Sequence, residues 1–228
     1  MSVYLSSRLE HHHAHVDYPR EVTVANSLKL ANFLREMADD YFYKIISIEI
    51  QDNAGGDVSG MRMLQSRFRQ LQERDITIAT KGFGMIASAA AVTLSCGSLG
   101  HRSVGEDAML LYHLGRVSAG EHMTASKAKM ISSRLDVLDQ KIILSLIDHI
   151  LPSAIVMSDT DETNTWTWPL QSFSDMDFKG LDIQPKKFTC EKKCRNFMSV
   201  KLLEIFERDA VMSPASAVAL GLIDHVVQ

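Results

Sequence analysis

The sequence has few cysteines and no long apolar run, and each absence argues against a class of protein. Three cysteines in 228 residues, an odd number, argue against a secreted fold built on disulfide bonds. The longest apolar stretch, near Met85 to Leu94, is too short to cross a bilayer. The first residues lack a basic segment followed by an apolar one, so no secretory signal is expected. We therefore expect a cytoplasmic protein without a membrane partner.

An excess of charge of one sign is also missing. The formal net charge is −4 and 23% of the residues are charged, so no broad phosphate-binding surface is predicted. The basic clusters at 67–69 and 192–195 are short and typical of solvated faces, so no nucleic-acid partner is expected. Apolar residues make up 46% of the chain, which predicts one domain over residues 1–228 with its own core.

Helical and strand patterns alternate along the chain. Apolar runs typical of buried strands cover 44–51, 76–80, 109–113 and 222–227, and the glycines at 82–84 predict a break after the second run. Helical patterns cover 24–41, 59–71, 88–95, 122–151, 199–208 and 213–220. This alternation predicts an α/β fold with a mainly parallel sheet.

One segment interrupts the alternation. Residues 152–193 contain both tryptophans and an acidic run at 159–162, and they show no clear period. A long irregular stretch of this kind is typical of an insertion. We therefore predict an insertion at about 152–193, before the C-terminal segment, and not a separate core.

Ser88 follows a predicted strand and turn, and it opens a predicted helix. The amide of Ala89 is then unpaired at the helix N-terminus and can point at an anion. Acyl transfer needs such an arrangement, with an exposed nucleophile and donors that face the developing oxyanion. On this segment alone, a serine that merely caps the helix is the better interpretation.

A second turn between a strand and a helix lies at Asn53–Gly56. Its paired glycines let the backbone approach a ligand and turn an amide outward, so the two turns together would form a two-donor oxyanion hole. Asp57, which follows, is expected to face away and to cap the next helix.

His113 ends an apolar strand, where α/β sheets present side chains to ligands, and Asp209 follows a predicted helix. Taken singly, the histidine is more typical of a structural residue and the aspartate of a solvated one.

Together these segments resemble the proteolytic subunits of Clp proteases. Residues 53–58 resemble the Asn-Ser-Pro-Gly-Gly-x-Val turn of that family, and residues 84–88 resemble its Gly-Gln-Ala-Ala-Ser nucleophile segment. His113 stands where the family has the histidine that ends a Met-Ile-His strand. Residues 208–224 resemble the family's C-terminal Arg-Asp-x-Phe-Leu-Ser segment and the helix and strand after it. The resemblance covers roughly residues 46–227, without the insertion.

The resemblance implies a serine endopeptidase. Ser88 would attack the peptide carbonyl, His113 would act as general base and then general acid, and Asp209 would orient the imidazole. The backbone amides of Gly56 and Ala89 would hold the oxyanion. No metal ion and no organic cofactor are implied.

The resemblance also implies an assembly. Members of the family have a crotonase-like α/β spiral of ββα units and stack as two heptameric rings around a closed chamber. The long helix at 122–151 would form an interface in such a homo-oligomer. An AAA+ ATPase unfoldase would feed unfolded proteins or peptides to the chamber. ATP binding would belong to that partner, because this chain has no Gly-x-x-x-x-Gly-Lys-Ser/Thr motif.

Three alternatives remain open at this point. A Clp-like maturation protease of a phage would use the same chemistry. A catalytically silent scaffold or regulatory subunit would keep the fold without turnover. A crotonase-type acyl-CoA enzyme would share the paired oxyanion amides but would not need the serine, histidine and aspartate.

Two further groups of side chains have metal-ligating chemistry. The histidines at 11–15 offer imidazoles for a transition metal, and Cys190 and Cys194 have half of the ligand set of a zinc site. Both groups are more commonly chance groupings than metal sites, and no second Cys/His pair lies near the two cysteines in the sequence.

Overall fold

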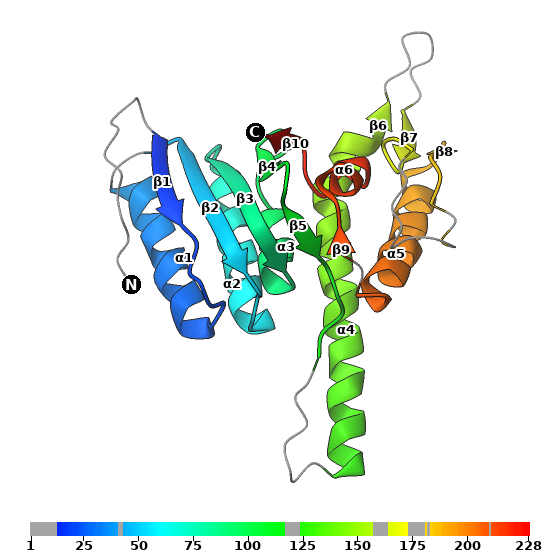
Figure 1. The fold of residues 1–228 in the computed structure, drawn as a ribbon, viewed down its shortest axis with the longest axis horizontal. Coiled ribbons are helices and arrows are strands. Elements are labelled where there is room, and N and C mark those ends of the chain that lie inside the picture. The colour runs from blue at the N-terminus through cyan, green and yellow to red at the C-terminus, as the bar shows by residue number, and fades with distance from the viewer. Residues whose placement is uncertain are drawn as a thin grey trace.

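The computed structural model describes residues 13–40, 43–116, 124–156, 164–172, 181, 183–209 and 211–228. It has an α/β fold whose main sheet is mostly parallel, as the sequence predicts (Figure 1). Within the described residues, the main sheet has seven strands; β1, β2, β3, β4 and β10 are parallel neighbours in that order, and β5 pairs with β3 and with the antiparallel β9. These strands are β1 His13–Asp17, β2 Ile45–Asn53, β3 Thr77–Ala87, β4 Arg102–Gly105, β5 Met109–Leu111, β9 Val211–Met212 and β10 His225–Val227.

The predicted helices are confirmed, with small shifts at most of their ends. They are α1 Val24–Asp39, α2 Val58–Gln72, α3 Ala89–Leu94, α4 Ala125–Ile150, α5 Glu191–Glu207 and α6 Pro214–Ala219, and a 3-10 turn, η1 Leu151–Ala154, follows α4. The prediction for α5 began too late. Cys194 and Met198 are fully buried and continue its core-facing side toward the N-terminus, so the helix starts inside the range assigned to the insertion.

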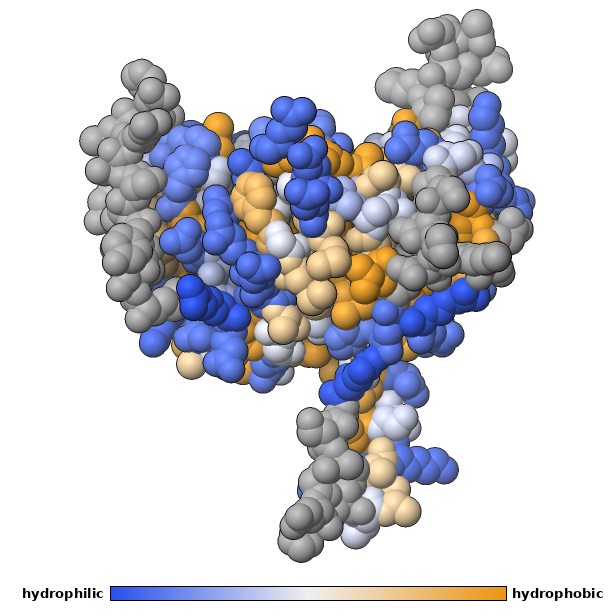
Figure 2. All heavy atoms as spheres, viewed as in Figure 1, coloured by the Kyte–Doolittle hydropathy of each residue, from blue (hydrophilic) through white to orange (hydrophobic). Residues whose placement is uncertain are grey.

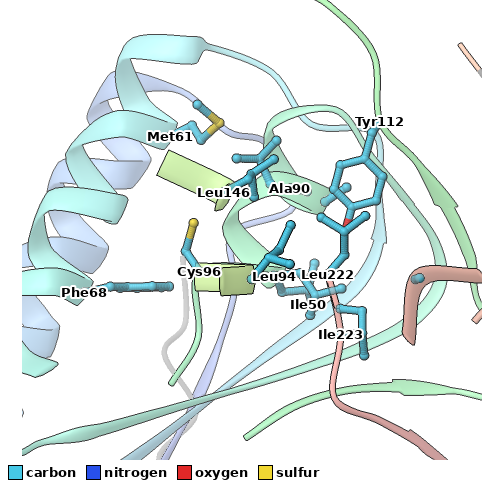
Figure 3. Close-up of a cluster of buried hydrophobic side chains, with 14 of the residues drawn as sticks. Ile50, Met61, Phe68, Ala90, Leu94, Cys96, Tyr112, Leu146, Leu222 and Ile223 are labelled. Atoms are coloured by element: carbon cyan, nitrogen blue, oxygen red, sulfur yellow. The ribbon is translucent and has the colours of Figure 1, made fainter. Parts of the chain in front are cut away.

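Burial alternates along β2, which lies between β1 and β3 in the sheet. Ile46, Ile48 and Ile50 are fully buried on one face, whereas Ser47 and Glu49 on the other face are partly exposed. Helices α1 and α2 lie against the buried face in Figure 1. Figure 3 shows part of the core that results, in which Met61 and Phe68 point from α2 toward the cluster that contains Ile50, Leu94 and Leu146.

The predicted break at residues 82–84 is wrong, because β3 continues through it to Ala87. The first part of β3 pairs with β4, and the last part pairs with β5. Gly84 makes this continuation possible with a φ of +66°, where an added Cβ would lie only 2.1 Å from Oδ1 of Asp52. The longer strand carries the chain to Ser88 beside the end of β5.

The two ends of α4 have different surroundings. Its buried residues are Asp139, Ile143, Leu146, Ile147 and Ile150, all in the C-terminal part. The N-terminal part projects beyond the rest of the ribbon in Figure 1 and carries hydrophobic side chains between polar ones in Figure 2. Met130 and Val137 in this part are 47% and 50% exposed. Of the helices described, none is sufficiently long and apolar to span a membrane.

The segment predicted as an insertion packs on the main body through a small antiparallel sheet. Its strands are β6 Ile155–Val156, β7 Thr165–Trp168 and β8 Lys186–Phe188. Trp168 is fully buried, and its Nε1 donates a hydrogen bond to the carbonyl of Leu220 at 2.9 Å. The amide of Leu170 donates to the carbonyl of Ala219 at 2.7 Å. The tryptophan therefore joins this segment to the C-terminal part of the core.

Candidate active site

Ser88 occupies a sharp turn between β3 and α3. Its backbone has φ +57° and ψ −128°, a conformation that non-glycine residues adopt at a cost of about 1–3 kcal/mol. The amide of Ser88 donates to the carbonyl of Leu111 at 2.7 Å, which ties the turn to the end of β5. The side chain makes no capping hydrogen bond with α3. The interpretation of Ser88 as a plain helix cap is therefore wrong, and the turn has the strained strand-to-helix geometry that exposes nucleophilic serines.

The glycine turn packs directly against the Ser88 turn. Gly55 has φ +90°, and a Cβ added there would lie 2.6 Å from the Cβ of Ser88 and 2.7 Å from the carbonyl oxygen of Ala87. Asn53 is buried and fixes this approach, since its Oδ1 accepts from the Gly55 amide at 2.8 Å and its Nδ2 donates to the Pro19 carbonyl at 2.8 Å. Only a glycine allows the two turns to come so close.

The two amides predicted to hold an oxyanion have no backbone acceptor among the described residues. Neither Gly56 nor Ala89 donates such a bond, whereas the neighbouring Asp57 amide donates to the Val22 carbonyl at 2.6 Å. Gly56 lies so close to this carbonyl that an added Cβ would be 2.3 Å from its oxygen. The Asp57 carboxylate caps α2 by accepting from the amide of Ser59 at 2.6 Å, as predicted.

His113 follows β5 and lies next to the Ser88 turn because β5 pairs with the last residues of β3. Its Nδ1 is 2.6 Å from the carbonyl oxygen of Leu114. A carbonyl can only accept, so Nδ1 carries the proton in this contact. The neutral imidazole then has its lone pair on Nε2, the nitrogen that a general base uses toward a serine in the usual triad.

A hollow of about 240 Å³ joins these pieces. Gly56, Ser88, Ala89 and His113 all line it, whereas Asp209 does not. The remaining lining residues are Val58, Met61, Val92, Leu114, Gly115, Arg116, Asp139, Ile142 and Phe206. The hollow therefore combines a serine, an imidazole and two backbone amides with a mainly apolar wall, which suits acyl transfer.

Asp209 lies at the rim of this site and contacts a different group. The short antiparallel pairing of β9 with β5 brings the chain after α5 back beside the histidine strand. Asp209 has φ +51° and forms an ion pair with Arg116, in which the two side chains are 43% and 66% exposed. Within the described part of the chain, no hydrogen bond joins His113 to Ser88 or to Asp209. The structure thus brings Ser88 and His113 to one hollow but leaves Asp209 on Arg116.

A carboxylate that the sequence did not single out lies inside the hollow. Asp139 of α4 is 7% exposed, and its Oδ1 accepts from the amide of Gly115 at 2.8 Å. Burial raises its pKa, the nearby Asp136 adds to this, and the Gly115 hydrogen bond and the charge of His113 oppose it. Nothing in the helical pattern separates Asp139 from its neighbour Asp136, which is exposed, so the sequence offered no signal for its burial.

The possible metal ligands do not gather into a site in the described residues. His13 and His15 lie on β1 with their rings stacked at 4.4 Å, and Nε2 of His13 is 2.6 Å from the hydroxyl of Ser47. His11 and His12 lie outside the described residues. Cys190 is exposed at the start of α5 whereas Cys194 is buried, and both are free thiols. The described residues contain no group of three or more metal-ligating side chains placed to hold an ion.

Comparison with known proteins leaves the site to be interpreted from its geometry. No protein-family profile matches the chain, and no protein of curated function matches it significantly.

Proposed function

We propose that this protein is a serine endopeptidase of the Clp proteolytic-subunit type. One observation carries the proposal. Ser88 lies on a strained strand-to-helix turn, its side chain makes no capping hydrogen bond with α3, and it lines the same hollow as His113. The order of motifs along the sequence supports the same assignment. Two further features would suit a crotonase-like spiral. The strand β3 pairs with β4 along its first part and with β5 along its last part. The amides of Gly56 and Ala89, at the glycine turn and at the start of α3, have no backbone acceptor among the described residues.

In this proposal the chemistry proceeds in two acyl-transfer steps. The Oγ of Ser88 attacks the scissile carbonyl while Nε2 of His113 takes its proton and then passes it to the leaving amine. Water attacks the acyl-enzyme by the same route in reverse. The amides of Gly56 and Ala89 donate to the oxyanion, and each such donor lowers the barrier by about 3 kcal/mol. Asp209 becomes the third member of the triad when its carboxylate leaves Arg116 and turns to Nδ1 of His113.

The proposed substrate is an unfolded protein or peptide, and the proposed setting is a homo-oligomeric ring. The projecting part of α4 supports an interface role, since Met130 and Val137 are 47% and 50% exposed there, whereas the buried residues of the helix all lie in its C-terminal part. An AAA+ unfoldase would deliver substrate to the chamber. Assembly would also supply a reason for Asp209 to change partner, because Arg116 and Asp209 are both near the surface.

A catalytically silent scaffold is the second candidate, and the ion pair between Arg116 and Asp209 favours it. With Asp209 held by Arg116 and Nδ1 of His113 on a backbone carbonyl, the isolated chain has no complete triad. A scaffold would keep this arrangement in the assembled state as well.

Labelling with a fluorophosphonate probe, followed by intact mass, tests the proposal. A peptidase gives one adduct on Ser88, which Ser88→Ala removes and His113→Ala reduces by at least about 100-fold. Ser66→Ala, which removes an exposed serine of α2, is the matched control and should label like the wild type. Cleavage of an unfolded protein by a sample whose Ser88 reacts with the probe separates a peptidase from another serine hydrolase. An assembled, folded sample without any adduct favours the scaffold.

A further inference from the structure

The carboxylate of Asp139 lies at the point where α4 enters the body of the protein. It is the first buried residue of the helix, and it lines the hollow together with Ser88 and His113. Asp136, one turn earlier, is exposed. An ionised carboxylate in such a place is costly unless hydrogen bonds or an opposite charge compensate it. The groups that offset the cost of burying the Asp139 carboxylate therefore indicate the role of this residue.

The first compensating group is the backbone that follows His113. The Gly115 amide donates to Oδ1 of Asp139 at 2.8 Å. A Cβ added at Gly115 would lie 3.2 Å from Oδ1 and 3.6 Å from Oδ2, so both carboxylate oxygens face this glycine. Asp139 thus fastens the segment after His113 to a long helix. Among the residues that the structure describes, the only other polar contact of this segment with a distant side chain is the exposed ion pair of Arg116 with Asp209.

The second compensating group is the imidazole itself. No Lys or Arg forms an ion pair with Asp139 in the described residues, and its pKa responds to the charges of Asp136 and His113. Arg116 also lines the hollow, but its side chain is 66% exposed and forms no ion pair with Asp139. His113 lies two residues before the Gly115 amide and lines the same hollow as Asp139, so an imidazolium there places a positive charge close to the buried carboxylate. That imidazolium forms whenever His113 takes the proton of Ser88.

We propose that Asp139 is a positioning residue of this active site, which holds the Gly115 backbone so that His113 faces Ser88 and which stabilises the imidazolium by its charge. The inference rests on the proposed peptidase function for its meaning, but its physical content concerns only His113, Gly115 and Asp139. Asp209 and Asp139 then have different roles. Asp209 hydrogen-bonds the imidazole in the assembled state, and Asp139 supplies a negative charge from its place on the Gly115 amide.

The test uses Asp139→Asn, which keeps an oxygen acceptor for the Gly115 amide but removes the charge, and Asp139→Ala, which removes both. Asp136→Asn, which removes a neighbouring charge at the surface of the same helix, is the matched control. The titration of the His113 imidazole is followed by NMR in the full-length protein, a readout that needs no catalysis. In Asp139→Asn its midpoint should fall, because the charge nearest the imidazole in the hollow is lost, and in Asp136→Asn it should change less, because Asp136 is exposed.

Fluorophosphonate labelling of the same variants gives the second readout. The rate at Ser88 should fall about 10-fold in Asp139→Asn, with its pH profile moved to lower pH, and about 100-fold in Asp139→Ala. An unchanged His113 titration in a folded Asp139→Asn overturns the inference, whatever Ser88 does. If the titration moves as expected but the wild type gives no adduct, the charge coupling stands and the peptidase proposal fails.

Discussion

The segments that carry Ser88 and Asp209 differ in how they are held. Ser88 sits between a buried parallel strand and a buried helix, against a glycine turn that leaves no room for another atom. Asp209 sits between the end of α5 and a two-residue strand, and its ion pair with Arg116 is largely in solvent. The serine side of the site is therefore tightly packed, whereas the aspartate side depends on weak surface contacts.

The largest effect is expected where the serine side is tightest. Gly55→Ala places a Cβ against Ser88, Ala87 and the amide of Ala89 at a φ of +90°, so the two turns must separate. We expect the free energy of unfolding to fall by about 2–4 kcal/mol and labelling of Ser88 to fall by at least about 100-fold. Urea unfolding and fluorophosphonate labelling measure the two.

Gly100→Ala is the control for that substitution. Gly100 also has a positive φ, +79°, but an added Cβ would have no atom within 4 Å. It should therefore show only the conformational cost of about 1 kcal/mol, with normal labelling. Equal effects of the two alanines would mean that the close approach of Gly55 to Ser88 is unimportant.

A pH effect on stability is expected from the buried part of α4. Burial, and after it the positive charges of Arg102 and Arg69, lower the pKa of His149 from 6.5 to about 4. The unfolded chain therefore binds a proton that the folded chain does not in the window between these values. His149 stabilises the fold fully above pH 6.5, and the contribution is lost as the pH falls toward 4.

Urea unfolding near neutral pH and near pH 5 measures this contribution. The wild type should lose about 1–2 kcal/mol more than His149→Gln between the two conditions. At each pH, labelling of Ser88 should be the same in the wild type and in His149→Gln as long as both proteins remain folded. Equal losses in both proteins would show that the imidazole is solvated in the folded state.

A smaller effect should reveal the strain at Ser88. Because φ +57° and ψ −128° suit glycine better than any residue with a Cβ, Ser88→Gly should be more stable than Ser88→Ala by about 1 kcal/mol. Thermal or urea unfolding of the two variants, both unable to form the adduct, gives this difference directly. A more stable alanine variant would mean that the turn relaxes to an ordinary conformation.

The smallest effect on stability is expected on the aspartate side. Arg116→Gln removes an ion pair whose side chains are 66% and 43% exposed, so the free energy of unfolding should change by less than about 1 kcal/mol. The variant also releases Asp209 from its present partner. Labelling of Ser88 in the isolated chain should therefore rise by a few-fold, and a fall would assign Arg116 a supporting role in the site.

Local patterns in the sequence predicted most of the fold. The isoleucines of β2 and the helical faces of α1 and α2 are short-range signals, and the structure confirms the elements they predict. The strands β1, β4 and β9 were not predicted. They are short or rich in polar residues, and pairing with neighbouring strands decides their conformation. The same holds for residues 82–84, where two flanking strands keep an apparent break extended.

For the candidate site, the sequence by itself determined the turns. The paired glycines and the serine that opens a small-residue helix indicate where a hydroxyl and two free amides can lie, because backbone conformation is largely a local property. The sequence did not predict that the Ser88 side chain leaves the helix uncapped, since the local pattern favoured a helix cap. Tertiary structure alone decided which acids lie near His113. Asp139 and Asp209 are distant from it in the sequence, and only the packing of α4 and the pairing of β9 with β5 set their burial and partners. Electrostatic environment depends on the whole fold, so no local pattern can reveal it.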